Sequence, residues 1–307
     1  MATLGIDLGG TFARAAVVDE RGAILAAART ALAERSPAAV VEAIAQAAQE
    51  AQAAAGVPVR AIGVGAAGQI PVDSGLIAVA PNLGWRNVPL GTLLSERLGH
   101  PVRLVNDLSA AAWGELHAGA GRGAQDLLVV FVGSGVGSAI IANGQLLRGA
   151  NGVGAELGHV KVVPDGRACG CGERGCLEAY AGGHHLIAQA RELLLEGGAP
   201  ELARLCAQEP LTPLTLERAA QAGDARAHAV HARAGQMLAL AVANQVTVLN
   251  PARLILGGGV LNHCPGLRQQ VLDGVQAWSG RTAREGLLVL DAELGDDSGL
   301  IGAALLA

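Results

Sequence analysis

One pattern of strands and glycine-rich turns occurs twice in the chain, and it restricts the possible folds more than any other feature. Residues 4–25 and 130–147 each read as an apolar strand, a glycine-rich turn, a second apolar strand, a tight turn and a third strand. Aligning the two copies pairs the turn positions, namely Asp7, Gly9 and Thr11 with Gly133, Gly135 and Gly137. Such a repeat predicts two duplicated α/β halves with a cleft between them. Glycine-rich hairpins are common, so a chance match is the alternative.

Strand and helix patterns alternate along the rest of the chain, which is typical of an α/β protein. Ser36 followed by Pro37 predicts the start of a helix, and Gly56 predicts its end. A strand is expected at 59–65, followed by a loop rich in glycine and proline that runs to Trp85.

The length of 307 residues favours two domains. We expect a smaller N-terminal α/β domain at 1–107 and a larger α/β domain at 108–295, which contains a loop of candidate metal ligands, residues 159–176 (the metal-ligand loop), and the candidate nucleotide-binding turns. The apolar segment 298–307 predicts a last helix, at about 296–307, that packs back on the first domain.

Hydrophobic residues make up 51% of the chain but aromatic residues only 2%, so Ala, Val, Leu and Ile must build the core. Residues 127–147 carry no charge, but glycines and the turn signals Gly-Ser-Gly and Asn-Gly divide them into two buried strands, so no membrane segment is expected. The first residues have no basic and apolar leader pattern, so no secretory signal is expected, and three of the five cysteines lie close together, as metal ligands in a reducing compartment do. A cytoplasmic location is therefore expected.

The charge balance and the single lysine exclude several classes of protein. The chain has 22 basic and 27 acidic residues, which argues against a nucleic-acid partner held by a basic face. Lys161 is the only lysine and does not follow a glycine, so neither a GxxxxGK[ST] phosphate loop nor a protein-kinase fold is possible. The GxGxxG sequence at 63–68 is followed by Pro71 rather than a helix, which argues against a dinucleotide fold.

The glycine turns are candidate phosphate-binding segments, because glycine lets backbone N–H groups approach a phosphate closely. The Thr11 hydroxyl could add a donor, and Asp7 could hold Mg²⁺ directly or through water. The turn 257–259 ends a strand and opens a helix, where the nucleoside end could lie. The candidate nucleotide-binding residues are Asp7, Gly9, Gly10, Thr11, Gly133, Ser134, Gly135, Gly137, Gly257, Gly258 and Gly259. Each turn alone could equally be a simple tight turn.

Asn106 and Asp107 lie where a strand ends and a helix begins. A helix N-terminus favours an ionised carboxylate, so Asp107 could accept a proton at neutral pH. The alternative is that Asp107 is only the N-cap of the helix.

Four metal-type ligands lie within a short segment: His159, Cys169, Cys171 and Cys176. One histidine and three cysteines suit a closed, structural zinc site, and the alternative is a reactive thiol cluster. Glu156 and Glu178 flank these ligands and could be plain surface charges. If zinc fixes the loop, both carboxylates become candidate ligands for a polyhydroxylated molecule.

With these motifs, the chain resembles the ROK family of sugar kinases, repressors and open reading frames, and within it is most similar to bacterial glucokinases. The resemblance covers nearly the whole chain and rests on these segments: LGIDLGGT (4–11), PNLGW (81–85), VNDLSAAAWGE (105–115), the signature at 132–159 and CGCGERGCLEAY (169–180). GSGVG in place of the usual GTGVG keeps a hydroxyl, and Arg14 stands where lysine is common. A first strand starting at residue 2 is expected to leave no room for the helix-turn-helix of the family's repressors.

The resemblance implies an actin-like (ribonuclease-H-like) two-domain fold that binds MgATP and a hexose, and transfer of phosphate to the 6-hydroxyl of glucose. Asp107 would be the general base. The residues implied to hold the sugar are Gly68, Asn82, Asn106, Asp107, Glu156, His159 and Glu178. His159 would also bind the structural zinc, and the family's members imply a homodimer or homotetramer.

Two alternatives stay open at this point. One is a kinase for another hexose, such as N-acetylmannosamine, N-acetylglucosamine, fructose or mannose, because pocket size cannot be read from the sequence. The other is a sugar sensor that has lost catalysis, which the intact Asp107 and phosphate turns disfavour. Whether polyphosphate or ADP replaces ATP also stays open.

Overall fold

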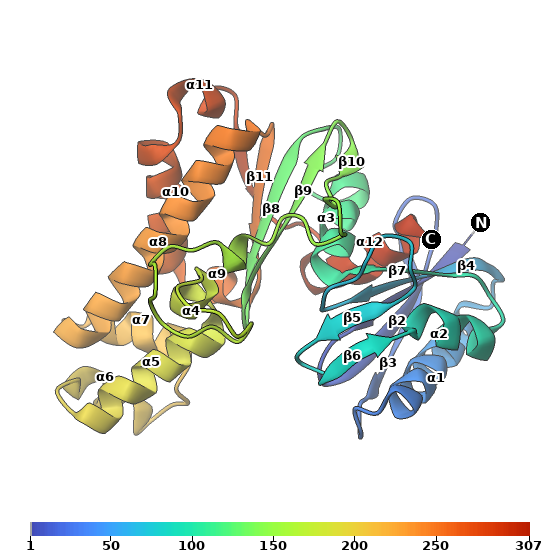
Figure 1. The fold of residues 1–307 in the computed structure, drawn as a ribbon, viewed down its shortest axis with the longest axis horizontal. Coiled ribbons are helices and arrows are strands. Elements are labelled where there is room, and N and C mark those ends of the chain that lie inside the picture. Colours follow the sequence, from blue (N-terminus) through green and yellow to red (C-terminus); the bar gives the residue numbers. More distant parts are fainter. Residues whose placement is uncertain (1) are drawn as a thin grey trace. The chain divides into compact units, whose positions relative to one another are not determined.

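The structure is a computed structural model that describes residues 2–307, with alternating strands and helices (Figure 1). The strands are β1 (Ala2–Leu8), β2 (Phe12–Val18), β3 (Ile24–Ala31), β4 (Val59–Ala66), β5 (Ile77–Ala80), β6 (Trp85–Val88), β7 (Val102–Asn106), β8 (Leu127–Val132), β9 (Val136–Ala142), β10 (Gln145–Leu146), β11 (Arg253–Gly257) and β12 (Leu288–Asp291). The α-helices are α1 (Pro37–Ala55), α2 (Leu90–Leu98), α3 (Asp107–Ala118), α4 (Glu178–Ala181), α5 (Gly183–Glu196), α6 (Pro200–Cys206), α7 (Pro213–Gln221), α8 (Ala225–Leu249), α9 (Gly259–His263), α10 (Pro265–Trp278), α11 (Arg281–Arg284) and α12 (Ser298–Leu306).

Two five-stranded sheets have the same strand order. The first runs β3-β2-β1-β4-β7, with β1 antiparallel to β2 and parallel to β4. The second runs β10-β9-β8-β11-β12, so each strand of the first repeat has its counterpart at the equivalent place. This order agrees with the duplication predicted from the two glycine hairpins. The third strand differs between the copies, because β3 has eight residues and β10 only two.

The chain divides into two compact units. The first unit comprises Met1–Leu127, Ala139–Ala155 and Ala292–Ala307. The second comprises Leu128–Ser138 and Glu156–Asp291. The first unit thus includes the first sheet with α1, α2, α3 and α12, and the second unit includes the metal-ligand loop and α4 to α11.

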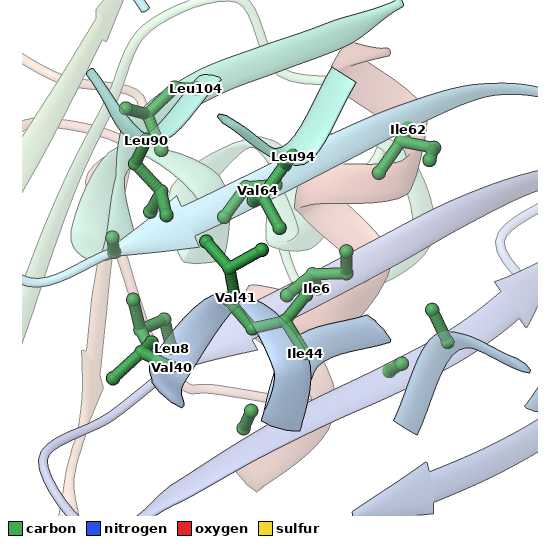
Figure 2. Close-up of a cluster of buried hydrophobic side chains, with 14 of the residues drawn as sticks. Ile6, Leu8, Val40, Val41, Ile44, Ile62, Val64, Leu90, Leu94 and Leu104 are labelled. Carbon is green, nitrogen blue, oxygen red and sulfur yellow. The ribbon is translucent and has the colours of Figure 1, made fainter. Parts of the chain in front are cut away.

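The core of the first unit lies between its sheet and helices α1 and α2. Aliphatic side chains from β1, β4, β7, α1 and α2 meet there (Figure 2). The helix α1 begins and ends where the sequence predicts, because Ser36 accepts a hydrogen bond from the Ala39 N–H and Gly56 takes the left-handed conformation at the other end. Alanine and branched aliphatic residues fill this core as the composition requires.

Helix α12, drawn in red in Figure 1, packs against the blue and cyan strands β1, β2 and β4 and against α3. Glycines allow this close approach. A Cβ on Gly63 would lie 1.7 Å from the Ala303 carbonyl oxygen, and one on Gly5 would lie 2.0 Å from that of Leu300. On the helix itself, a Cβ on Gly302 would lie 1.7 Å from the Ala110 carbonyl oxygen of α3. These glycines form a contact surface that we call the α12 seam: Gly5, Gly63, Gly114 and Gly302.

Residues 127–147 form β8 and β9, which confirms the expectation of two buried strands in this uncharged stretch, and the short β10, which is not buried. Within residues 2–307, no helix is both long and apolar enough to cross a membrane. The loop expected up to Trp85 is wrong in one respect, since Ile77–Ala80 and Trp85–Val88 pair as a small antiparallel sheet.

Candidate functional site

Asn106 and Asp107 stand at the junction of β7 and α3, and Asn106 is the residue that caps the helix. Its backbone is extended, and its Oδ1 atom accepts hydrogen bonds from the first turn of the helix, of 2.9 Å from the Leu108 N–H and 3.2 Å from the Ser109 N–H. The alternative reading of Asp107 as the N-cap is therefore wrong. Asp107 is the first helical residue, half-buried, and its Oδ1 accepts from the Leu108 N–H at 2.9 Å.

Asn106 also holds the end of β4 through Gly68. The Asn106 Nδ2 donates to the Gly68 carbonyl at 3.2 Å. Gly68 has a φ of +145°, and a Cβ there would lie 2.5 Å from the Val79 carbonyl oxygen, so only glycine fits. The structure therefore brings Gly68, Asn106 and Asp107 together at the carboxyl ends of β4 and β7.

The first glycine turn follows β1. Asp7 lies near the end of that strand, and Arg14 donates to its Oδ2 from both Nε and Nη2 at 3.1 Å. Burial raises the pKa of the Asp7 carboxyl, and Arg14 opposes this shift. Asp7 Oδ1 accepts no hydrogen bond from residues 2–307, so one carboxylate oxygen is left that could bind a divalent cation or its water.

Gly10 of this turn lies beside Asn82, which the family resemblance implies to hold the sugar. Gly9 donates its N–H to the Phe12 carbonyl at 3.1 Å and closes the turn. A Cβ on Gly10 would lie 3.8 Å from Asn82 Nδ2. Thr11 and Asn82 are exposed, so both polar side chains can reach a ligand.

The second glycine turn, between β8 and β9, is fastened to the start of α5. The Gly183 N–H donates to the Gly133 carbonyl at 3.0 Å, and the His184 N–H donates to the Ser134 carbonyl at 2.9 Å. The turn thus lies at a helix N-terminus, where the backbone favours anions. Gly137 lies inside β9 rather than in the turn.

The third glycine segment lies against the end of β8. Gly258 has a φ of +90°, and a Cβ there would lie 2.6 Å from the Val132 carbonyl oxygen. Gly257 ends β11 and Gly259 opens α9. A Cβ on Gly183 would meet both Val260 and the Gly133 carbonyl, so the two glycine segments of the second unit lie side by side.

The four proposed metal ligands gather at one point. One ligand atom from each of His159, Cys169, Cys171 and Cys176 lies within 4.8 Å of the others. The distance from His159 Nδ1 to Cys169 Sγ is 3.8 Å, and so is that between the sulfurs of Cys171 and Cys176. Sulfur ligands about 2.3 Å from a tetrahedral zinc ion lie about 3.8 Å apart, so the set fits zinc.

The surroundings of the cluster also suit a metal-thiolate centre. Burial raises the pKa of the Cys169 thiol to about 12, so without a cation this buried sulfur stays protonated. Lys161 places its ammonium group 3.1 Å from Cys176 Sγ, where its charge stabilises a thiolate. The buried Tyr180 holds the loop by accepting from the Arg167 N–H at 2.9 Å. Lys161 and Tyr180 have no spacing signal that marks these contacts in the sequence.

Glu156 and Glu178 lie close to the cluster. Glu156 Oε2 is 3.9 Å from His159 Nε2, and partial burial raises the pKa of the Glu156 carboxyl, with His159 opposing and Glu178 adding to the shift. Glu178 Oε1 lies 3.7 Å from Cys169 Sγ. Cys169, Glu178 and His185 also bring ligand atoms within 4.8 Å of one another, a proximity of His185 that sequence spacing did not indicate. The structure thus groups Glu156, His159 and Glu178, as a site for a polyhydroxylated ligand requires.

The matching strand orders and the similarity to solved structures define the class of this protein. It is a duplicated α/β protein with the actin-like sugar-kinase fold. The chain belongs to the ROK family, whose profile matches residues 3–307. The family and the fold class predicted from the sequence are therefore confirmed.

Individual relatives cover the whole chain. A glucokinase from Streptomyces coelicolor is 36% identical over 99% of this chain and 97% of its own length. An N-acetylmannosamine kinase from Citrobacter koseri is 32% identical over 100% of this chain and 99% of its own length. The crystal structure of a ROK family glucokinase from Streptomyces griseus, in complex with glucose and AMPPNP, superimposes with a TM-score of 0.84 at 36% identity, covering 100% of this chain and 99% of that one. The predicted enzyme class, a sugar kinase, is confirmed.

Proposed function

We propose that the chain transfers the γ-phosphate of ATP to the 6-hydroxyl of a hexose, with glucose as the preferred acceptor. The observation that carries the proposal is the junction of β7 and α3, where Asn106 supplies the helix cap and Asp107 stands in the first helical turn. The full-length glucokinase relative and the glucose-bound and AMPPNP-bound structure support both substrates.

In this proposal Asp107 takes the proton of the 6-hydroxyl while the O6–Pγ bond forms. The bond between Pγ and the bridging oxygen breaks, and ADP leaves. Because the transferred phosphoryl group needs little covalent help, most of the rate enhancement comes from positioning and charge stabilisation. A helix N-terminus favours an ionised carboxylate, which suits Asp107 to accept the proton.

The sugar hydroxyls would be held, besides Asp107, by the residues that the family resemblance implies. These are Gly68, Asn82, Asn106, Glu156, His159 and Glu178. Since the Asn106 Oδ1 already caps α3, its remaining Nδ2 hydrogen is the part that can reach a sugar oxygen. His159 would bind zinc with one ring nitrogen and face the sugar with the other, so zinc binding would orient the sugar pocket.

The nucleotide would lie on the glycine turns 9–11, 133–135 and 257–259. Mg²⁺ bound with ATP would neutralise phosphate charge, and Asp7 Oδ1 is the atom that could hold it or its water. Zinc, held by His159, Cys169, Cys171 and Cys176, would stabilise the loop and take no part in the chemical step.

A kinase for another hexose is the second candidate, favoured by the full-length similarity to an N-acetylmannosamine kinase. A non-catalytic sugar sensor is the third, and it would bind MgATP and sugar without forming product. ADP release should be measured with MgATP against glucose, mannose, fructose, N-acetylglucosamine and N-acetylmannosamine. A kcat/KM for glucose at least about tenfold above the others supports the glucokinase assignment, since one tenfold step corresponds to about 1.4 kcal/mol of transition-state discrimination. A higher kcat/KM for an N-acetyl sugar would make that sugar the assigned substrate in place of glucose. No ADP release with any of the five sugars would favour the sensor.

The assignment of Asp107 has its own test. Asp107→Asn keeps the size of the side chain but removes the proton acceptor, so kcat should fall at least about 100-fold while the Kd for the sugar stays within about threefold. Turnover close to that of the wild type would contradict the role of Asp107 as the base.

The proposal also includes a cytoplasmic location and a homodimer or homotetramer. Cys169, Cys171 and Cys176 lie together as the metal ligands of a protein in a reducing compartment do. Light scattering of the purified chain measures its mass directly, and a monomer at micromolar concentration would contradict the oligomer.

A further inference from the structure

Glu178 contacts two segments of the second unit that lie far apart in the sequence. It is the first residue of α4 and follows Cys176 by two positions. Its Oε2 accepts a 3.0 Å hydrogen bond from the Val136 N–H, directly after the glycine turn 133–135. Its Oε1 lies 3.7 Å from the metal-ligand sulfur of Cys169. The carboxylate therefore bridges the glycine turn and the metal-ligand loop.

The turn is shaped to receive this carboxylate. A Cβ on Gly135 would lie 2.2 Å from Glu178 Oε2, so a larger residue there would push the carboxylate away. The carbonyls of Gly133 and Ser134 accept hydrogen bonds from the first two N–H groups of α5. Hydrogen bonds therefore hold the turn in two ways: its carbonyl groups bind α5, and the Val136 N–H that follows it binds Glu178.

We propose that Glu178 is a positioning residue for the nucleotide, which holds the glycine turn 133–135 in its phosphate-binding conformation and makes that conformation depend on the metal-ligand loop. The inference rests on the proposed function, in which this turn binds phosphate. A carboxylate suits the task because a hydrogen bond from a backbone N–H to a charged oxygen is stronger than one to a neutral oxygen. Only Oε2 is needed for this bond, so Oε1 stays available to the sugar of the proposed function.

Nucleotide binding tests the proposal without turnover. The full-length, zinc-loaded chain and its variants are titrated with Mg²⁺ and AMPPNP in a calorimeter. Glu178→Ala should weaken AMPPNP binding about tenfold, the size expected for a lost charge-assisted hydrogen bond. Glu178→Gln keeps an oxygen that can accept from Val136 and should stay within about threefold of the wild type. Glu196→Ala removes an exposed carboxylate at the end of α5 and is the matched control, expected to bind like the wild type.

Zinc content, measured by mass spectrometry on each protein, should be equal in all of them. Equal AMPPNP affinity in Glu178→Ala and the wild type would overturn the proposal, and so would a Glu178→Gln variant as weak as Glu178→Ala. A wild-type chain that binds no AMPPNP would instead overturn the proposed function. The two failures are therefore distinguishable.

A second variant tests the same contact if Glu178→Ala does not fold. Gly135→Ala places a methyl group against Glu178 Oε2. Hydrogen exchange at the Val136 amide should then become faster, because its acceptor is displaced. Unchanged exchange at Val136 in a folded Gly135→Ala variant would overturn the proposal.

Discussion

At the scale of single residues, Asn106 links a helix start to a distant loop. Asn and Asp are both good N-caps, so the sequence Asn-Asp does not decide which residue caps α3. The backbone decides, because Asn106 is extended and Asp107 is already helical. The bond from Asn106 to Gly68 joins residues 38 positions apart, and no local signal predicts it. The sequence therefore locates the pair but does not show that Asn106 is the cap and Asp107 the first helical residue.

Substitution of Asn106 separates these two contacts. Asn106→Ala removes the cap and the bond to Gly68, and the free energy of unfolding should fall by about 2 kcal/mol. Asn106→Asp keeps a capping oxygen but cannot donate to Gly68, so about half of that loss should remain. Urea denaturation measures both values. Equal stability of the two variants would show that the bond to Gly68 accounts for the whole loss, and wild-type stability of Asn106→Asp would show that this bond contributes nothing.

At the scale of elements, the sequence predicts a helix with clear capping residues correctly but misses a short hairpin. Ser36, Pro37 and Gly56 mark α1 correctly because capping depends only on nearby residues. The hairpin of β5 and β6 escaped prediction, since each strand has four residues and lies between glycines and prolines. Its formation depends on burying Ile77 and Trp85 in the core, which is a contact with distant parts of the chain.

The α12 seam gives a prediction at this scale. Gly63→Ala places a methyl group 1.7 Å from the Ala303 carbonyl oxygen, and backbone cannot yield as a side chain can. The free energy of unfolding should fall by about 3 kcal/mol. Ala27→Val adds bulk at an exposed position of the same sheet, on β3, and should change stability by less than about 0.5 kcal/mol. Thermal melting of both variants checks this, and equal melting temperatures would contradict the close approach.

At the scale of the whole molecule, the sequence predicts the duplication but not the length of every repeated strand. The matching positions of the two glycine hairpins indicated duplication, and both sheets have the corresponding order. Only Gln145–Leu146 forms the third strand of the second repeat, and its length depends on pairing with β9 rather than on an apolar pattern, because Gln145 is polar. The gathering of the metal-type ligands was easier to foresee, since three of the four cluster residues lie within a short segment of the chain.

Metal removal should affect one unit more than the other. Chelation, or Cys169→Ser, should increase hydrogen exchange in residues 156–182 and weaken sugar binding together, because the loop loses its cross-link. Peptides from β1 and β4, in the first unit, should exchange as before. Cys206→Ser is the matched control, since Cys206 lies outside the cluster. Full sugar affinity in a chain shown to be free of zinc would contradict the structural role.

The packing of α12 has a consequence for synthesis on the ribosome. The surfaces of β1, β4 and α3 that it covers are made early, whereas Ser298–Leu306 is made after the whole second unit. At ordinary rates of translation the covering helix emerges roughly 10 to 40 seconds after α3. During that interval the nascent first sheet exposes an apolar surface to the cell, and a chaperone that binds it would protect the chain from aggregation.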